Sequence, residues 1–213
     1  MDKRKDTTTA NEKMWDARAK NYDKYFWFTH WDEKKLVSVL KLNDKFSLLD
    51  LACGPGWALR YIDQQTKGTG ELYGVDISSN MIKTAQKNSA VQKNIHFRKT
   101  NAEDLPFDNN IFDCIICTNA FHHFANPDNV LREAYRVLKP GGRIHILDIT
   151  GDFFFIRWLD RLFKLEPGHV KIYSTKDFRI LFQKARLNYL TSKITILPMV
   201  KIHIAEKSSK QTP

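Results

Sequence analysis

The stretch LLDLACGPGWALR, residues 48–60, constrains the fold of this chain more than any other part of its sequence. An apolar run ends at Asp50, the chain then passes through Gly54 and Gly56, and a helical pattern begins at Trp57. This order predicts a strand, a tight turn and a helix. Because glycine has no side chain, such a turn brings backbone N–H groups and the positive end of a helix close to a ligand. The stretch therefore predicts a nucleoside-type cofactor at the carboxyl edge of a parallel sheet, with one carboxylate beside it.

After this stretch, short apolar runs alternate with helical patterns as far as residue 149, which is typical of a doubly wound α/β sheet. The run at 112–118 is apolar almost throughout, as expected for a strand buried on both faces. Two further strands are expected at about 187–197 and 199–205, as an antiparallel hairpin at the edge of the sheet. We therefore predict seven strands, of which five alternate with helices.

The first 45 residues contain no strand pattern, so they are expected to form a helical cap or lid ahead of one domain at 46–213. Residues 1–13 are polar and are expected to be frayed. A helical pattern begins at Trp15, the aromatic sequence FWFTHW follows at 26–31, and a second helix is predicted at 32–40. The aromatic residues at 26–28 have two interpretations: they cover a binding site, or they belong to the core.

Residues 152–174 form a long insertion between two expected strands. Its aromatic and leucine side chains recur at helical spacing, which predicts a helix with one apolar face. The aromatic cluster at 153–155 with Trp158 lies among basic residues and has two interpretations. It contacts a membrane surface or a lipophilic substrate, or it packs as a cap on the sheet. Ser174 and Asp177 then have the spacing of a capping box, which predicts the start of the next helix.

The composition is that of a globular protein, with 42% hydrophobic and 27% charged residues. No run of about 18 apolar residues occurs, and the first residues lack the apolar core of a secretory signal. Three cysteines in a chain of this size favour the reducing cytoplasm over a disulfide framework. The net charge of +10 lies mostly after residue 150. This excess either attracts nucleic acid, anionic lipid or an acidic substrate, or is an ordinary solvated surface.

Asp76 adds a second carboxylate, at the end of the strand expected at 71–78. In this class of fold an acid at that place accepts hydrogen bonds from two ribose hydroxyls, because a carboxylate offers two oxygens to two donors. The dinucleotide fingerprint also requires a glycine three residues after Gly56, where this chain has Leu59. A nicotinamide cofactor is therefore disfavoured.

Five motifs, in this order, resemble those of the class I S-adenosylmethionine-dependent methyltransferases. They are LLDLACGPGW at 48–57, GVDIS at 74–78, NAEDLPF at 101–107, FDCIICTNAFHHF at 112–124 and LREAYRVLKPGG at 131–142. The resemblance covers about 46–149 and is greatest to the small-molecule branch that includes the ubiquinone and menaquinone biosynthesis enzymes, the methyltransferase type 11 group. It implies a Rossmann-like doubly wound seven-stranded sheet, S-adenosylmethionine as cofactor, S-adenosylhomocysteine as product and no metal. It says little about the acceptor.

The resemblance further implies a cofactor site at the ends of the strands. Segment 50–56 would hold the methionine part, with Asp50 near its amino group, and Asp76 would accept from the ribose. Segment 101–103 would meet the adenine. The implied cofactor-binding residues are Asp50, Ala52, Cys53, Gly54, Gly56, Asp76, Ile77, Met81, Asn101, Ala102, Glu103, Thr118 and Asn119. The family often has glycine in place of Ala52 and an acid in place of Asn101.

Methyl transfer needs few acid or base groups, because a sulfonium is already an activated donor and catalysis is chiefly positioning in a site without water. A hydroxyl acceptor would still benefit from a base. His122 and His123 are placed to reach that space, or they are loop histidines packed beneath the lid. Tyr22, Tyr173 and His169 are weaker candidates in expected lid segments.

No metal site is predicted. Cys114 and Cys117 have CxxC spacing, but side chains three residues apart on a strand face opposite sides of the sheet. The seven histidines show no spacing typical of metal ligands.

Three functions agree with these observations. The leading hypothesis is methyl transfer from S-adenosylmethionine to a small-molecule acceptor of apolar or aromatic character, with the N-terminal helices and the insertion roofing the pocket. The charge suggests a nucleic-acid methyltransferase instead, although residues 118–121 read TNAF and not the Asn-Pro-Pro-aromatic motif of enzymes that methylate base amines. The third hypothesis is a cofactor-binding regulatory protein without catalysis. Peripheral contact with a membrane is left open.

Overall fold

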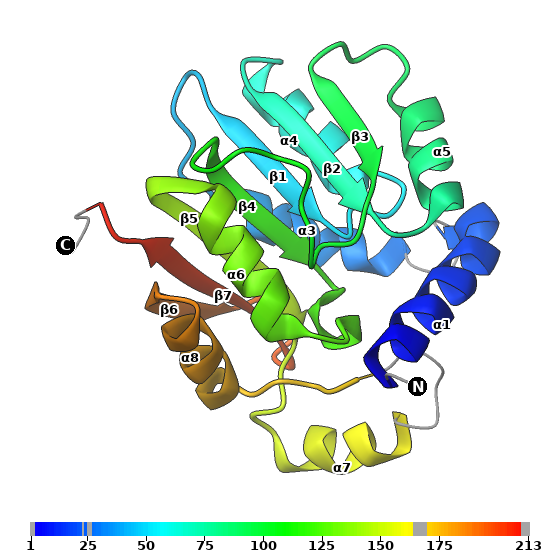
Figure 1. The fold of residues 1–213 in the computed structure, drawn as a ribbon, viewed down its shortest axis with the longest axis vertical. Coiled ribbons are helices and arrows are strands. Elements are labelled where there is room, and N and C mark those ends of the chain that lie inside the picture. Colours follow the sequence, from blue (N-terminus) through cyan, green and yellow to red (C-terminus); the bar gives the residue numbers. More distant parts are fainter. Residues whose placement is uncertain (1–2, 23, 25–26, 164–169, 210–213) are drawn as a thin grey trace.

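A computed structural model describes residues 3–22, 24, 27–163 and 170–209, and it contains a seven-stranded sheet between layers of helices (Figure 1). The strand order is β3-β2-β1-β4-β5-β7-β6. Strands β1 to β5 are parallel to one another, whereas β7 is antiparallel to both β5 and β6, so the predicted fold class is confirmed. The strands are β1 Ser47–Leu51, β2 Glu71–Asp76, β3 Ile95–Lys99, β4 Phe112–Thr118, β5 Leu138–Ile149, β6 Leu187–Ile194 and β7 Val200–Lys207.

Alternation along the central strands divides the core into two layers. In β1, Leu48 packs with α3 and α4 on one face, whereas Leu49 packs with α6 and α8 on the other. Helix α6 presents Val130, Leu131, Ala134 and Val137 to the sheet, the apolar positions of an amphipathic pattern. The helices are α1 Lys3–Arg18, α3 His30–Val37, α4 Trp57–Thr66, α5 Ser79–Asn88, α6 Pro127–Val137, α7 Phe154–Phe163 and α8 Thr175–Lys184, with 3-10 turns η1 Ala19–Asn21, η2 Trp27–Thr29 and η3 Phe121–His123.

The strand order reverses at β1, which pairs with β2 on one side and with β4 on the other. The connections that leave β1 and β4 therefore cross to opposite sides of the sheet. In open α/β sheets this reversal leaves a crevice beyond the carboxyl ends of the central strands. The first four of the five motifs singled out in the sequence include or follow the ends of β1, β2, β3 and β4 at this same edge, whereas the fifth lies in α6 and the start of β5.

The N-terminal segment differs from the prediction. Residues 1–13 were expected to be frayed, but α1 is helical from Lys3 and lies beside α5 at the carboxyl edge (Figure 1). Tertiary contacts explain the difference. The Asp16 carboxylate accepts hydrogen bonds from Ser78 Oγ at 2.5 Å and Asn80 N at 3.0 Å, and Lys99 Nζ lies 2.7 Å from Glu12 Oε1. A polar helix with little apolar face is thus held by its polar groups, which local sequence patterns do not reveal.

Several helix and strand boundaries also differ from the predicted ones. The second helix, expected at 32–40, is α3 at His30–Val37, and the hairpin expected at 187–197 and 199–205 is β6 Leu187–Ile194 with β7 Val200–Lys207. Strand β5 begins at Leu138, within the LKPGG sequence expected to be only a turn, and its register against β4 shifts there. That sequence does end α6, as predicted, because proline cannot continue a helix.

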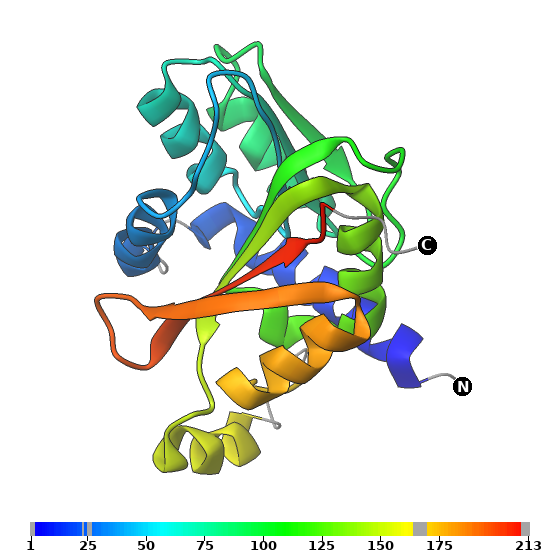
Figure 2. The same ribbon diagram turned by 90° about the vertical axis from the view of Figure 1, so that its left-hand side faces the viewer.

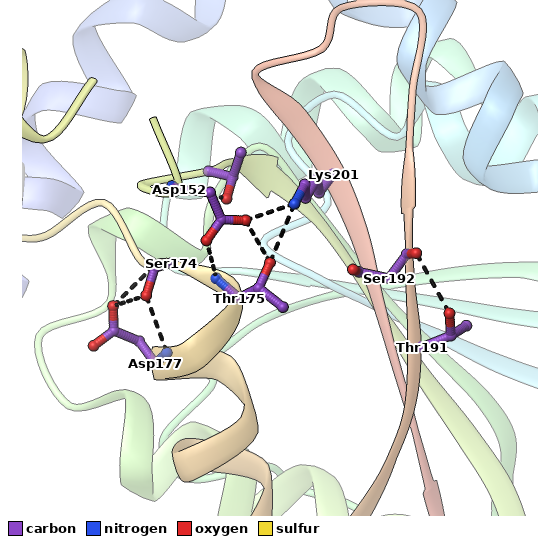
Figure 3. Close-up of polar contacts among 8 residues, drawn as sticks. Asp152, Ser174, Thr175, Asp177, Thr191, Ser192 and Lys201 are labelled. Carbon is purple, nitrogen blue, oxygen red and sulfur yellow. Dashed lines mark hydrogen bonds and ion pairs between the residues drawn. The ribbon is translucent and has the colours of Figure 1, made fainter. Parts of the chain in front are cut away.

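The insertion joins the antiparallel strands through a small polar cluster (Figure 3). The Asp152 carboxylate accepts from Lys201 Nζ at 2.6 Å and from Thr175 Oγ1 at 2.5 Å. The predicted capping box is confirmed: Ser174 Oγ accepts from Asp177 N at 3.2 Å, and Ser174 N donates to the Asp177 carboxylate at 2.9 Å. Within the described residues, no helix is both long and apolar enough to cross a membrane.

Candidate functional site

The glycine turn after β1 uses three residues in the left-handed region of backbone space. These are Ala52 with φ 57°, Gly54 with φ 52° and Gly56 with φ 77°. Gly56 is the N-cap of α4, and a Cβ built on it would lie 2.7 Å from the Phe97 ring. Left-handed backbone is strained for any residue with a Cβ, so the turn requires glycine at 56 and holds Ala52 at a cost. The chain thereby reverses within five residues and begins α4 at Trp57, as predicted.

Asp76, the last residue of β2, connects this turn to the neighbouring strand. Its carboxylate accepts a hydrogen bond from Gly54 N at 2.9 Å and another from Ser78 N at 2.8 Å. Burial raises the pKa of Asp76 to about 6, against the opposing effect of these two N–H groups. The carboxylate is therefore poised to gain from further donors, because each additional hydrogen bond favours its charged form.

An open pocket of about 750 Å³ lies beyond the carboxyl ends of β1, β2 and β4. It brings together residues from four separate stretches of the sequence, from α1 and from Tyr22 after η1. Of the residues named from the sequence, it is lined by Tyr22, Ala52, Gly54, Asp76, Ile77, Met81, Asn101, Ala102, Glu103, Thr118, Asn119 and His123. Asp50, Cys53, Gly56 and His122 are not among its lining residues.

Asp50 lies behind the pocket wall, fully buried at the end of β1. Neither of its carboxylate oxygens has a hydrogen-bond partner among the described residues. Burial raises the pKa of Asp50 well above its ordinary value, and the nearby carboxylates of Glu33 and Asp76 raise it further. A buried carboxyl without donors is costly, so this position is suited to a cationic or donor group arriving from outside.

The loops after β3 and β4 supply the remaining polar groups. The Asn101 side-chain oxygen accepts from Glu103 N at 3.0 Å and so fixes its own loop. Asn119 has a left-handed backbone with φ 52°, and its N–H donates to Leu147 O at 2.8 Å. Its side-chain nitrogen is buried and has no acceptor among the described residues. Asn119 thus lines the pocket and holds an unpaired donor within the described residues.

Helix α1, in the segment predicted to be a cap or lid, supplies a pocket wall through residues that the sequence analysis did not name. Thr8, Asn11 and Trp15 all line the pocket. Asn11 Nδ2 donates to His123 O at 2.7 Å, and the Trp15 ring meets the His123 ring edge-on with 5.2 Å between centroids. Their spacing of three and four residues places them on one helix face, which is the signal that could have identified them.

The two candidate histidines have different surroundings. His123 lines the pocket beneath α1, whereas His122 Nδ1 is 2.7 Å from Asp148 Oδ1. Burial acts to raise the pKa of Asp148, but the His122 ring and N–H groups outweigh it and hold that pKa below its ordinary value. An ionised Asp148 requires a proton on Nδ1 of His122, which fixes the orientation of the ring. Asp148 was not named from the sequence, although a lone acid ending an apolar strand is a recognisable signal.

The remaining candidates from the sequence that the structure describes do not line the pocket. Tyr173 is buried in the core between Phe121 and Phe178, away from the pocket lining, and His169 lies outside the described residues. Cys114 packs in the layer with α4 and Cys117 in the layer with α6, as expected for side chains on opposite faces. Among the described residues no group of three or more metal-ligating side chains is arranged to hold a metal.

Comparison with known proteins agrees with this geometry. Residues 49–146 match the family model described as a methyltransferase domain. The ubiquinone/menaquinone biosynthesis C-methyltransferase UbiE of Haemophilus ducreyi is 36% identical over 110 residues, which is 50% of this chain and 42% of that protein. UbiE of Wigglesworthia glossinidia brevipalpis is 30% identical over 179 residues, 81% of this chain and 66% of that protein. The chain thus spans about half to two thirds of the length of these relatives.

Solved structures show the same fold. A chain from the complex of the Haloferax volcanii Trm112 methyltransferase activator with a methyltransferase has a TM-score of 0.82 at 20% identity, covering 95% of this chain and 99% of that one. The YcgJ protein of Bacillus subtilis has a TM-score of 0.69 at 26% identity, covering 77% of this chain and 72% of its own. Residues 49–146 of this chain thus belong to the methyltransferase domain family.

Proposed function

We propose that this chain transfers a methyl group from S-adenosylmethionine to a small acceptor of apolar or aromatic character. One observation carries the proposal: the pocket at the carboxyl edge joins the glycine turn after β1 to the carboxylate that ends β2. The family supports the cofactor, and the UbiE relatives, which are named for C-methylation in ubiquinone and menaquinone biosynthesis, support an aromatic acceptor.

The residues present fit the nucleoside part of the cofactor. Asp76 would accept from the two ribose hydroxyls, since each oxygen of a carboxylate can accept more than the one N–H bond made here. Ile77 and Met81 would border the adenine with apolar surface. Ala102 would offer its backbone N–H to the base. Segment 101–103 is already held in place by the Asn101 side chain.

The residues at the methionine end fit a cation. Buried Asp50, whose oxygens lack partners among the described residues, lies behind the turn that would receive the amino group. A cation bound at that turn would favour the ionised form of Asp50 over the neutral form that burial favours, because opposite charges interact strongly in a buried environment. Asn119 and Thr118 would line the same end.

When bound, S-adenosylmethionine supplies an already activated methyl group, so the protein's own part is to bind, to orient the acceptor and to exclude water. Trp15 and Phe124 give the acceptor side of the pocket an aromatic lining, beside Ala120 and Ala125. Helix α1 would act as the lid, since it closes the pocket through Asn11 and Trp15.

A base is needed only for an acceptor that loses a proton. His123 lines the pocket and is the candidate for direct contact, together with Tyr22. His122 would act as a positioning residue, because its ring is fixed by Asp148 and it precedes His123 in η3. We place the enzyme in the cytoplasm. Its three cysteines are all free and buried, which supports a reducing compartment.

Cofactor binding by titration calorimetry tests the proposal. Wild-type protein is expected to bind S-adenosylmethionine, and Asp76→Ala is expected to lose about 100-fold in affinity because two charge-assisted hydrogen bonds disappear. Asp44→Ala, which removes an exposed carboxyl before β1, is the matched control and should bind as wild type does. No binding by the wild type, or unchanged binding by Asp76→Ala, would refute the proposal.

Product formation separates the acceptor classes. We expect S-adenosylhomocysteine to accumulate with a naphthoquinol or a benzoquinol as acceptor, and not with single-stranded RNA. Turnover of RNA alone would favour the nucleic-acid methyltransferase. Tight cofactor binding without product from any acceptor would favour the regulatory protein.

A further inference from the structure

Large apolar side chains lie exposed on three segments that are far apart in the sequence. Helix α7 and the residue before it expose Phe153, Phe154, Phe155 and Trp158, with Phe154 86% and Trp158 57% exposed. The turn between β6 and β7 exposes Ile194, Ile196 and Leu197, with Ile196 60% exposed. The N-terminal part exposes Phe28 and Trp31, the latter 60%. Of the two interpretations of the aromatic cluster in the insertion, packing against the sheet does not describe these side chains.

The three segments lie on one side of the molecule. Helix α3, the β6–β7 turn and α7 follow one another down the left edge of Figure 2, and the same order from top to bottom holds in Figure 1. Thr150 N donates to Met199 O at 2.8 Å, and Lys201 Nζ bonds to Asp152 at 2.6 Å (Figure 3). These contacts fix the start of the insertion beside the β6–β7 turn. We call the exposed apolar side chains of these segments the apolar edge.

Exposed charges along the apolar edge are predominantly positive. Lys34 and Lys35 on α3, Lys193 beside the turn and Arg157 on α7 are all exposed. Within the described parts of 30–37, 190–200 and 152–160, Asp152 is the only exposed acid, and Lys201 pairs with it. An interface between protein subunits usually lacks lysine at its centre, whereas aromatic side chains interspersed with Lys and Arg are typical of surfaces that dock on anionic lipid.

We propose that the apolar edge docks this protein on the surface of a bilayer that contains anionic lipid. Phe154, Trp158 and Ile196 would enter the boundary between headgroups and acyl chains, while the basic side chains would remain among the headgroups. The inference does not depend on methyl transfer, since it rests on exposed side chains outside the pocket. Docking would place α7, which follows β5 at the carboxyl edge, against the bilayer.

Vesicle co-sedimentation of the full chain tests the proposal. One set of vesicles contains phosphatidylcholine with about one third phosphatidylglycerol, a fraction chosen to mimic an anionic surface, and the other contains phosphatidylcholine alone. We expect binding to the anionic vesicles, several-fold weaker binding to the neutral ones, and partial release by salt. A double variant, Phe154→Ser with Trp158→Ser, should reduce binding at least tenfold.

Val91→Ser is the matched control. Val91 is 85% exposed, almost as much as Phe154, but it belongs to the loop between α5 and β3. That loop lies at the opposite end of the molecule from α7 (Figure 1). Its replacement should leave vesicle binding unchanged. Both variants remove only exposed side chains, and circular dichroism and S-adenosylmethionine binding equal to those of the wild type would show that they are folded.

Three outcomes would overturn the proposal: no sedimentation with anionic vesicles, equal loss for Val91→Ser and the double variant, or wild-type dimers that the double variant converts to monomers. The last outcome, read by light scattering, would assign the apolar edge to a second copy of this chain. None of these outcomes bears on cofactor affinity, so failure of this proposal and failure of the proposed function are distinguishable.

Discussion

The two halves of the sheet differ in the buried carboxyl and imidazole side chains that make no ion pair. Asp148, which is also buried in β5, pairs with His122. At the ends of β1 and β2, Asp50 and Asp76 are buried carboxyls whose pKa values are raised by burial. In β5 and β7, His145 and His203 are buried imidazoles, and burial lowers the pKa of each to about 4. The acids belong to the pocket or lie directly behind it, whereas the histidines are in the core beneath α8 and between strands.

Burying either kind of side chain costs desolvation free energy, but only the buried carboxyls lie where a ligand could offset that cost. Asp76 already accepts two N–H bonds and faces a pocket from which further donors can come. Both ring nitrogens of His203 lack a hydrogen-bond partner among the described residues, and its ring stacks on Phe178 with 4.0 Å between centroids. In the carboxyl half, β1 and β2, a ligand can therefore supply further donors, whereas His203 in the imidazole half, β5 and β7, packs its polar ring as if it were apolar.

The largest expected effect concerns the turn that positions the carboxyl half. Gly56→Ala places a Cβ 2.7 Å from the Phe97 ring at φ 77°, so we expect it to lower the free energy of unfolding by about 3 kcal/mol or more. Gly68→Ala has a similar φ of 74°, but its closest neighbour, Asp63 Oδ1, is 3.7 Å away. This control should cost only about 1 kcal/mol, from backbone strain alone. Urea denaturation measures both, and equal losses would show that close packing at Gly56 is unimportant.

The same turn shows which features of the site could be predicted from the sequence. Gly54, Gly56 and Asp76 were identified because glycine turns and strand-terminal acids are local patterns with a direct physical reason. Even the departure at Ala52 is informative, since its φ of 57° explains why the family often has glycine there. The capping box at Ser174 and the opposite faces of Cys114 and Cys117 were predictable for the same reason.

Features that depend on contacts between distant segments were not predictable. Residues 1–13 were expected to be frayed because they are polar, yet α1 begins at Lys3, and polar bonds from Asp16 to α5 and from Asn11 to η3 hold it over the pocket. The pairing of Asp148 with His122 joins strand β5 to a turn 26 residues away. The exposure of Trp158 depends on where α7 lies, and helical spacing alone does not distinguish a buried face from an exposed one.

The dependence of stability on pH tests the effect of the buried imidazoles. A folded pKa of about 4 against an ordinary value near 6.5 means that the unfolded chain binds protons first as the pH falls. The proton-linked loss of stability from His203 is therefore absent above pH 6.5, and it reaches up to about 3 kcal/mol between pH 6.5 and pH 4. We expect His203→Leu to flatten this part of the stability profile, measured by urea denaturation at each pH.

His96→Leu is the control for acid sensitivity, since His96 is exposed and contacts Glu71 at 3.1 Å. Its replacement removes an imidazole without removing a buried one. If both variants flatten the profile equally, burial is not the source of the acid sensitivity.

For the carboxyl half, we expect the pH to change the affinity for the cofactor. The folded pKa of Asp76 is about 6, raised from 3.8, and only the ionised group can accept from both ribose hydroxyls. Binding would therefore require loss of this proton below pH 6. We expect the affinity for S-adenosylmethionine to be constant above pH 7 and to fall by up to about tenfold per unit below pH 6. Asp76→Asn should bind weakly at every pH, and a wild-type profile that stays flat down to pH 5 would contradict this role.

The smallest expected effect concerns the two carboxylates, Asp16 and Glu12, that hold α1 over the pocket. Asp16 is partly buried and accepts from Ser78 Oγ and Asn80 N, whereas Glu12 makes an exposed pair with Lys99. Removing a carboxylate that accepts backbone N–H at a helix start costs about 1 kcal/mol, and removing an exposed ion pair costs less. We therefore expect Asp16→Ala to speed amide hydrogen exchange in α1 about fivefold and Glu12→Gln to change it less than twofold.

Exchange in the sheet should be unaffected by either change, because α1 is held by its own polar bonds and can open without the core. Acceleration in β1 and β2 as well would mean that α1 is part of the cooperative core and cannot act as a lid.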